Sequence, residues 1–449
     1  MEQLTKFLSE NTHIHYATPQ SPDYTELRPG FILNVREVPA MIVRPRSAED
    51  IAGLISVLTA NDLPFSIRGG GHDMYGRSQI HEGITIDMRE ISHVEVEVES
   101  LTARVGGGVI SMSLLKALEV HGVTTPHSVT PTVGYTGWAI HGGYGLLSAT
   151  CGMGVDQILG AKVIDARGSI RDADETMLTA IRGGGGAFGV IYELKIKVYA
   201  LNQVLAGAII YNPGDLGERI HHFNMKYWEL KEEGIPSRLT VYQSVMNGPV
   251  GKSLVVLFMW ASADTEEGQK WLSRISSWGP VAVNTVTVQS LADFNAITDS
   301  MVPKHTYGTM YSLCLHQLTP EVLDVIAEHA PLQPNNPEVI FTAHEVRAEA
   351  LKPSLTNVFI NRIPHFTIEV IPMAASAEKL EENLVWAQKF IAALKSTDPR
   401  NFVQSNYPPL TSTNDLDLKM YYGSYYNDLK KIKQQYDPDN VFKHTVIRL

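Results

Sequence analysis

Three clusters of glycine, all between residues 68 and 190, constrain the fold of this 449-residue chain more than any other feature. The first is Gly69-Gly70-Gly71, the second is spread over residues 134–145, and the third is the run of residues 183–186. Glycine weakens regular structure because it loses much conformational entropy on folding, so a cluster of glycines needs a structural reason. Each cluster lies beside a segment with strand periodicity. We interpret them as turns where the backbone comes very close to a large ligand.

The chain up to about residue 200 alternates between strand and helix patterns. Residues 1 to about 40 are predicted to be irregular because prolines recur in them. A helix is predicted after Ser47, a good N-cap residue with Asp50 in the capping position and apolar residues at helical spacing beyond it. A second helix is predicted from Ser111 to about Val120. Strands are predicted at 40–43, 64–67, 84–88, 94–98, 102–105 and 190–198.

The composition changes near residue 203, where the glycine clusters end and longer helical patterns begin. Helices are predicted at 215–232, 265–277, 320–330 and 377–395, with strand-like runs at 239–245, 254–261, 283–288 and 365–371. This arrangement indicates an α+β lobe with an antiparallel sheet. We therefore predict a first lobe over residues 1–202, a second over 203–404, and a tyrosine-rich C-terminal segment over 405–449.

Charge and composition exclude several classes of function. The formal net charge is −11 with no basic block, which argues against binding of nucleic acid or of an anionic membrane surface. Two cysteines, Cys151 and Cys314, form neither a disulfide framework nor a metal-ligand spacing, so no metal site is expected. No apolar leader or membrane span is visible, which favours an intracellular, cytoplasmic protein. The final tripeptide begins with Ile447, which does not fit a peroxisomal signal.

The first glycine cluster has the chemistry of an anion site. Arg68 and the three glycines lead out of a predicted strand to His72 and Asp73. Consecutive backbone N–H groups in such a turn form a concave site that suits a diphosphate.

The second cluster places glycine among bulky residues, a composition that suits a loop lying flat against a large planar ligand. No GxGxxG motif follows the first strand, so a Rossmann dehydrogenase is disfavoured.

Taken in order, these motifs resemble the FAD-linked oxidases of the berberine bridge enzyme type, in the vanillyl-alcohol oxidase class. The motifs that carry the resemblance are Arg68-Gly69-Gly70-Gly71-His72-Asp73, Thr132-Val133-Gly134, Gly142-Gly143-Tyr144-Gly145, residues 182–190, and the C-terminal Tyr436-Asp437-Pro438-Asp439-Asn440-Val441-Phe442. Bacterial 6-hydroxynicotine oxidases and fungal natural-product oxidases are similar members. The resemblance implies a two-part FAD-binding lobe of the PCMH type over about 37–202. It also implies a substrate lobe with an antiparallel sheet covered by helices, and a C-terminal segment that returns to the FAD lobe.

The resemblance also implies cofactor roles for individual residues. His72 matches the histidine that bonds the 8α-methyl carbon of the flavin. The other matches are Arg68, Gly69, Gly70, Gly71, Asp73, Gly76 and Ser78 around the diphosphate; Gly137, His141, Gly142 and Gly145 along the flavin and its ribityl chain; and Val190 near the adenine. Many relatives form a second link from a cysteine where this chain has Thr130, which cannot form a thioether. We therefore expect FAD with one covalent link.

Acid–base residues are expected on the strand predicted at 365–371. His365, Thr367 and Glu369 alternate along it and therefore share a face, which we expect to lie over the flavin. Glu369 is the first candidate for the general base, and His365 and Tyr421 follow it. An exposed strand carboxylate and a structural histidine are the alternatives for Glu369 and His365.

The predicted activity is that of an oxidase acting on a small organic molecule, such as a natural product, in secondary metabolism. Hydride would pass to flavin N5 and the electrons would pass to oxygen. One alternative keeps the flavin without net oxidation and catalyses isomerisation or cyclisation, including cycloaddition. A second alternative is a non-catalytic binding protein of the same fold, which the intact glycine clusters and His72 argue against.

Overall fold

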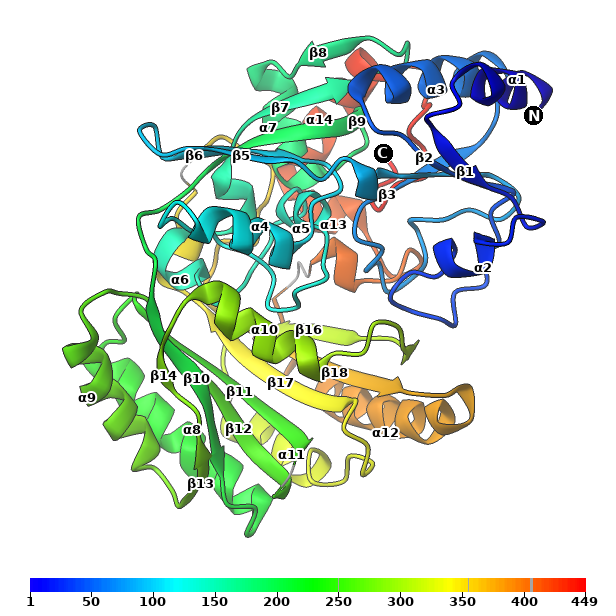
Figure 1. Cartoon of the computed structure of the whole chain (residues 1–449). Helices are drawn as coiled ribbons and strands as arrows, with labels where there is room; N and C mark the ends of the chain where they lie inside the picture. Colours follow the sequence, from blue (N-terminus) through cyan, green and yellow to red (C-terminus); the bar gives the residue numbers. More distant parts are fainter. Residues whose placement is uncertain (249, 354, 404–406) are drawn as a thin grey trace.

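The computed structural model describes residues 1–248, 250–353, 355–403 and 407–449. Its strands form three sheets, two in the first half of the chain and one in the second. Figure 1 shows the blue-to-green first half and the red C-terminal helices together on one side, and the green-to-orange sheet on the other. The C-terminal segment thus lies with the first lobe. No helix in the described ranges is both long and apolar enough to cross a membrane.

A four-stranded sheet begins the first lobe, in the order β1-β2-β4-β3. Its strands are β1 (His15–Ala17), β2 (Met41–Arg44), β3 (Phe65–Arg68) and β4 (Ile84–Asp87). The two inner contacts, β2 with β4 and β3 with β4, are parallel. Helix α3 (Ala48–Ala60) connects β2 to β3 and begins with the predicted capping box between Ser47 and Asp50. Its apolar face is buried against this sheet and helix α1 (Glu2–Glu10).

A five-stranded antiparallel sheet completes the first lobe, in the order β5-β6-β9-β7-β8. Its strands are β5 (Val94–Glu97), β6 (Thr102–Gly106), β7 (Ile158–Ile164), β8 (Ile170–Asp172) and β9 (Val190–Lys197). Helices α4 (Ser111–Glu119), α5 (Tyr135–Ala139) and α7 (Glu175–Gly184) contribute to its core, whereas α6 (Ser148–Cys151) contacts residues 348–351 and strand β11 (Leu239–Gly248) of the second half of the chain. Two C-terminal helices, α13 (Leu418–Tyr422) and α14 (Tyr426–Tyr436), bury Tyr421, Tyr422 and Leu429 in the same core.

The third sheet has nine strands, all antiparallel to their neighbours. Its main order is β13-β10-β12-β11-β17-β18-β15, with β14 beside β10 and β16 beside β18. The strands are β10 (Val204–Tyr211), β11 (Leu239–Gly248), β12 (Gly251–Trp260), β13 (Val281–Asn284), β14 (Thr287–Gln289), β15 (Tyr307–Gly308), β16 (Tyr311–Leu315), β17 (Val339–Val346) and β18 (His365–Ala374). Four helices cover one face: α8 (Leu216–Glu233), α9 (Thr265–Ser276), α11 (Pro320–His329) and α12 (Ala377–Lys395).

The two faces of this sheet have different partners because side chains alternate along a strand. On β18, Phe366, Ile368 and Val370 enter the apolar core under the helices. His365, Thr367 and Glu369 therefore share the opposite face, as predicted, and this face is directed toward the first lobe. Helix α10 (Leu291–Met301) packs on that face near β10 and against α4 of the first lobe.

Two local expectations were wrong. The first forty or so residues are not irregular throughout, because α1 places Leu4 and Leu8 against α3 and the short helix α2 (Tyr24–Leu27) buries Tyr24. Leu4 and Leu8 are four residues apart, which is the spacing of a helix. The prolines that suggested irregular structure lie after α1 and do not affect it. The second glycine cluster also begins with helix α5 rather than with an extended loop.

A buried ion pair joins the two lobes. Asp156, from the turn before β7, accepts two hydrogen bonds of 2.8 Å from the guanidinium of Arg362, just before β18. The same guanidinium donates to the carbonyl of Ala350 and lies over the ring of Phe359. Because both charges are almost fully buried, removal of one would leave the other without compensation.

We expect Arg362→Leu to lower the free energy of unfolding by about 3 to 5 kcal/mol, the usual cost of breaking a buried ion pair. Thermal and urea denaturation followed by circular dichroism would measure it. Arg400→Leu is the matched control, because Arg400 pairs with Asp398 on the surface and is 89% exposed. Equal stability of the two variants would contradict a structural role for the buried pair.

Candidate active site

The first two glycine clusters cross one another, backbone against backbone. A Cβ atom on Gly70 would overlap the amide nitrogen of Gly134, and a Cβ on Gly134 would overlap that of Gly70. Neither position therefore accepts a larger residue unless the chains separate. The crossing holds the segment after β3 against residues 130–134.

The turn after β3 leaves several backbone donors free. Within the described ranges, no group accepts a hydrogen bond from the amide nitrogens of Gly70, Gly71 or His72. Gly71 has a φ of +76°, which bends the chain so that successive amides can point to one side. Free amides in this arrangement form an anion site, so the turn fits a diphosphate.

His72 is held as a neutral imidazole. Its Nε2 lies 2.8 Å from the hydroxyl of Thr132, and its ring stacks on Phe31 at 4.3 Å with planes 17° apart. Burial lowers the pKa of His72 to about 4, and nearby His305 acts in the same direction. At neutral pH the ring therefore retains a lone pair that can act as a nucleophile.

The side chains of Arg68 and Asp73 are turned toward the protein. Arg68 is 1% exposed and donates to Asp87 and to the carbonyls of Leu27 and Arg28. Asp73 accepts hydrogen bonds from Arg77 and from the amide nitrogen of Tyr75. These two residues shape the turn from within, and their charged groups are already paired.

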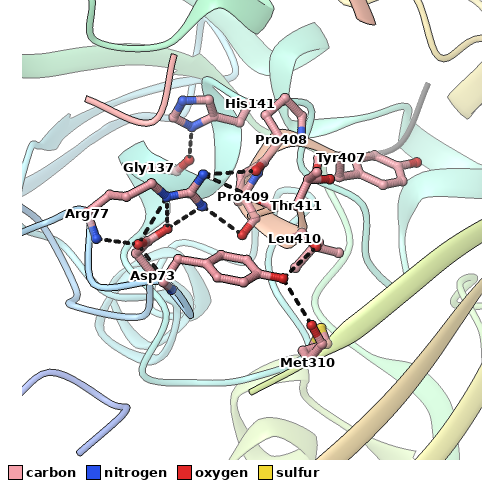
Figure 2. A network of polar contacts seen from close by, with 11 residues as sticks. Asp73, Arg77, Gly137, His141, Met310, Tyr407, Pro408, Pro409, Leu410 and Thr411 are labelled. Atoms are coloured by element: carbon pink, nitrogen blue, oxygen red, sulfur yellow. Dashed lines mark hydrogen bonds and ion pairs between the residues drawn. The ribbon is translucent and has the colours of Figure 1, made fainter. Parts of the chain in front are cut away.

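Arg77, which the sequence analysis did not single out, ties this turn to the C-terminal segment (Figure 2). Besides Asp73, its guanidinium donates to the carbonyls of Pro408, Pro409 and Thr411 at 3.4, 3.0 and 3.1 Å. The hydroxyl of Tyr75 is within hydrogen-bond distance of the carbonyls of Met310 and Leu410. The four-residue spacing of Asp73 and Arg77 was the available sequence signal.

His141 places an unpartnered nitrogen in the same region. Its Nδ1 lies 2.8 Å from the carbonyl of Gly137, while its buried Nε2 has no hydrogen-bond partner among the described residues. Burial lowers the pKa of His141 to about 4, so the ring is neutral and Nε2 is left as an acceptor. Gly137 faces open space, since a Cβ there would meet nothing within 4 Å.

The other predicted glycines pack against protein atoms. A Cβ on Gly142 would overlap Phe359, one on Gly145 would overlap the carbonyl of His127, and one on Gly76 would lie 2.7 Å from Val35. Gly69 is less crowded, because among the described residues a Cβ there would meet only the carbonyl oxygen of Gly107, at 3.6 Å. Ser78 accepts a hydrogen bond from the hydroxyl of Ser66 through its carbonyl.

The third glycine cluster is held by the C-terminal helices. The hydroxyl of Tyr422 donates to the carbonyl of Gly183, and the buried ammonium of Lys433 donates to the carbonyl of Ala187, both at 2.8 Å. The chain leaves the helical conformation at Arg182 and Gly183 before it enters β9 at Val190. The C-terminal segment thus fixes the position of this loop.

Glu369 meets the second glycine cluster. Tyr144, within that cluster, donates a short hydrogen bond from its hydroxyl to Oε1 of Glu369 on β18. Burial raises the pKa of Glu369 to about 6, although the bond from Tyr144 opposes the rise. Burial and the adjacent carboxylate both raise the pKa of Tyr144. A buried carboxylate with a raised pKa lies here where the two lobes meet, which is a frequent property of acid–base sites.

His344, which sequence reasoning missed, lies beside this pair. It occupies the site face of β17, stacks on Tyr242 at 4.1 Å and contacts Tyr144 at 4.8 Å between ring centres. Both of its ring nitrogens are buried without a hydrogen-bond partner among the described residues. Burial lowers its pKa to about 3. An alternating strand at residues 339–346 was the signal that could have placed it on this face.

The other two acid–base candidates are His365 and Tyr421. His365 has Nδ1 at 2.7 Å from the carbonyl of Ile363 and Nε2 at 3.4 Å from the hydroxyl of Tyr407, and burial lowers its pKa. Tyr421 is buried against Tyr422 in the core of the first lobe, and its hydroxyl has no hydrogen-bond partner in the described part of the chain. The structure thus joins Glu369 to Tyr144 and joins His365 to Tyr407.

Comparison with known proteins gives two family matches, one toward each end of the chain. The profile of the FAD binding domain family matches residues 39–174, and that of the berberine and berberine-like family matches residues 413–446. The FAD-linked oxidoreductase aurO of Gibberella zeae is 29% identical over 98% of this chain and 86% of its own length. The chain is thus similar over nearly its whole length to FAD-linked oxidoreductases, and its two profile matches are to families of the berberine bridge enzyme type.

Other similar proteins agree with this assignment. The (R)-6-hydroxynicotine oxidase of Paenarthrobacter nicotinovorans is 35% identical to this oxidoreductase, over 39% of each chain. Among solved structures, 6-hydroxy-D-nicotine oxidase of Arthrobacter nicotinovorans superposes with a TM-score of 0.82 at 21% identity, covering 96% of this chain and 97% of that one. Berberine bridge enzyme-like 1 of Physcomitrella patens gives 0.84 at 20% identity, covering 99% of both. The predicted fold class is thereby confirmed.

The residues present fit an FAD. Free amides at Gly70, Gly71 and His72 offer donors to a diphosphate, and the buried hydroxyl of Thr136 and Nε2 of His141 have no partner in the described structure. Among the described residues, the part of the chain that matches the FAD binding domain therefore contains unpaired polar groups that could serve a bound nucleotide.

The bond from Tyr144 makes a testable contribution to the pKa of Glu369. Because this bond stabilises the carboxylate, we expect Tyr144→Phe to move that pKa above its present value of about 6. Titration of the buried carboxyl by infrared or carbon-13 NMR spectroscopy would measure the change. Tyr242→Phe is the control, since Tyr242 stacks on His344 and donates no hydrogen bond to Glu369 within the described structure. An unchanged or lower pKa in Tyr144→Phe would contradict the assignment.

Proposed function

We propose that this oxidoreductase is an FAD-dependent oxidase that takes hydride from a small organic substrate, with Glu369 as the general base. In this proposal, residues 1–202 hold the FAD, residues 203–404 provide the substrate floor, and residues 405–449 fasten the FAD-binding lobe. When bound, FAD supplies a two-electron acceptor whose electrons pass to dioxygen. The chain itself supplies orientation, exclusion of water and proton transfer.

The contact between Tyr144 and Glu369 is the observation that carries the proposal. It places a carboxylate of raised pKa against the glycine cluster that the family resemblance assigns to the flavin. A base in this position can remove the O–H or N–H proton of the substrate while hydride leaves the neighbouring carbon. A pKa of about 6 keeps the carboxylate mostly ionised at pH 7 while leaving it a useful proton acceptor.

The surrounding side chains support a small polar aromatic or heterocyclic substrate. Tyr144, Tyr242 and Tyr407 provide aromatic surface around Glu369, and His344 provides two unsatisfied ring nitrogens. Natural products with a ring and an oxygen or nitrogen function match that lining. The similarity to a 6-hydroxynicotine oxidase supports the same class.

His72 is proposed to hold the flavin through a single covalent bond. Its ring is neutral and stacked, and one of its nitrogens has no hydrogen bond among the described residues, so this nitrogen is suited to alkylation by the flavin methyl carbon. A second covalent link is not expected, because Thr130 has no thiol and the half-buried Cys151 belongs to α6, outside segment 130–134.

Removal of the proposed base should have a large kinetic effect. We expect Glu369→Gln to lower kcat/KM by about 100- to 10,000-fold, the usual contribution of a positioned general base. In the unsubstituted enzyme kcat/KM should rise as pH increases through about 6 and then level, because only the ionised carboxylate accepts a proton. This rise should be absent in the variant. Oxygen uptake with a panel of small alcohols and amines that includes 6-hydroxynicotine would measure both.

Glu345→Gln is the matched control, because Glu345 lies in the same sheet and bonds to Tyr227 on the opposite face. A full rate in Glu369→Gln would rule out the proposed base. Substrate conversion without oxygen uptake or peroxide release would favour the redox-neutral isomerase or cyclase alternative.

The covalent link has a test that does not depend on the substrate. We expect the yellow chromophore to remain with the pellet when the purified protein is precipitated with acid, and His72→Ala to release it into the supernatant. His127→Ala is the control, since His127 is also buried but bonds to Thr125 and Asn295. A colourless protein that takes up no FAD would contradict the flavin assignment itself.

A further inference from the structure

The two ring nitrogens of His72 lie in different surroundings. Nε2 is 2.8 Å from the hydroxyl of Thr132, whereas Nδ1 has no hydrogen-bond partner among the described residues. Stacking on Phe31 limits the plane of the ring, and the contact with Thr132 selects one of the two orientations in that plane. Since Nε2 is already engaged, Nδ1 is the nitrogen left to react.

The position of Thr132 depends on the crossing of the first two glycine clusters. The carbonyl oxygen of Thr132 lies 3.0 Å from where a Cβ on Gly70 would be, so the two backbones are in direct contact. Thr132 also lies two residues before Gly134, the other glycine of the crossing. The close approach that the glycines permit is therefore what brings this hydroxyl to His72.

We infer that Thr132 is a positioning residue for covalent flavin attachment, and that it directs the bond to Nδ1 of His72. This inference rests on the proposed covalent link, and what it adds is the side chain that positions the histidine for that link. Thr132 acts through His72 and need not touch the flavin.

A hydroxyl suits this task because it can both accept and donate a hydrogen bond. Before attachment, Nε2–H donates to Oγ1 of Thr132, which leaves the lone pair of the neutral ring on Nδ1. After attachment, Nδ1 carries carbon and Nε2 has lost its proton, so the hydroxyl turns and donates to Nε2. Valine has a similar shape and can do neither, whereas serine can do both.

The overall attachment reaction is an oxidation, and dioxygen is its oxidant. A C–H bond of the 8α-methyl group is replaced by a C–N bond to the imidazole. One proton leaves the methyl carbon and one leaves the imidazole ring. The two electrons released pass to the isoalloxazine ring and then to dioxygen, which with the two protons becomes hydrogen peroxide.

His305 is the other titratable group that affects His72. Its Nδ1 lies 2.8 Å from the carbonyl of Gly30, next to Phe31. A positive charge there would oppose protonation of His72, in the same direction as burial. Both influences keep the His72 ring neutral, while Thr132 determines which nitrogen carries the proton.

The test compares Thr132→Val and Thr132→Ser in the full chain purified with its FAD. Total flavin is read from absorbance, and covalent flavin from the fraction that stays with the acid-precipitated protein over time in air. We expect Thr132→Val to bind FAD but to attach it at least about tenfold more slowly, the factor that one ordinary hydrogen bond contributes to a rate. Thr132→Ser should attach it at nearly the original rate. Thr102→Val is the control, because Thr102 lies on β6 and its hydroxyl bonds to Ser100 and Glu97.

The linkage atom provides a second measurement that does not depend on a variant folding. The flavin–histidine adduct released from the unsubstituted protein should be the Nδ1 isomer by NMR, and an Nε2 isomer would overturn the inference. Rapid and complete attachment in Thr132→Val would also overturn it. If the unsubstituted protein carries FAD without a covalent bond, the proposed link fails first, and the inference fails with it for that separate reason.

Discussion

The contact of two backbones at Gly70 and Gly134 is the constraint on which the site depends. It brings the turn after β3 against segment 130–134, and no side chain larger than hydrogen fits at either position. The free amides of the turn, the stacking of His72 and the reach of Thr132 all follow from this close approach. The glycines therefore allow two chain segments to come into contact. This contact leaves backbone amide groups unpaired among the described residues, and these amides could bind a ligand.

The contact between Tyr144 and Glu369, where we propose the acid–base chemistry, is made by the meeting of the two lobes. Tyr144 and Glu369 are 225 residues apart and come together because the polar face of the nine-stranded sheet is turned toward the glycine clusters. The opposite face carries the apolar residues that pack under four helices, so strand alternation alone separates the core residues from the proposed catalytic ones. The ion pair of Arg362 with Asp156 holds the two lobes in this relation.

The sequence predicted the elements with strong local signals and could not predict contacts between distant segments. The capping box at Ser47, the long helices of the second lobe and the shared face of His365, Thr367 and Glu369 follow from spacing alone. The inward direction of Arg68 could not be read in this way, because it depends on Asp87 and on carbonyls about forty residues away. His344 was not predicted as a site residue for a related reason. A single histidine on a strand carries no signal of its own, and its place in the site depends on contacts with Tyr144 and Tyr242, which are distant in sequence.

The fastening of the first lobe by the C-terminal segment has a consequence for synthesis on the ribosome. Tyr422, Leu429, Phe442 and Ile447 complete the apolar cores of a lobe whose strands end at residue 197. Arg77 likewise reaches its carbonyl partners only when residues 408–411 have been made. A nascent chain must therefore hold its early strands in an unfinished state while the whole second lobe is translated. The lobe that matches the FAD binding domain is therefore completed only once these C-terminal residues have been translated, and partial products lacking the last helix would expose apolar surface to chaperones and proteases.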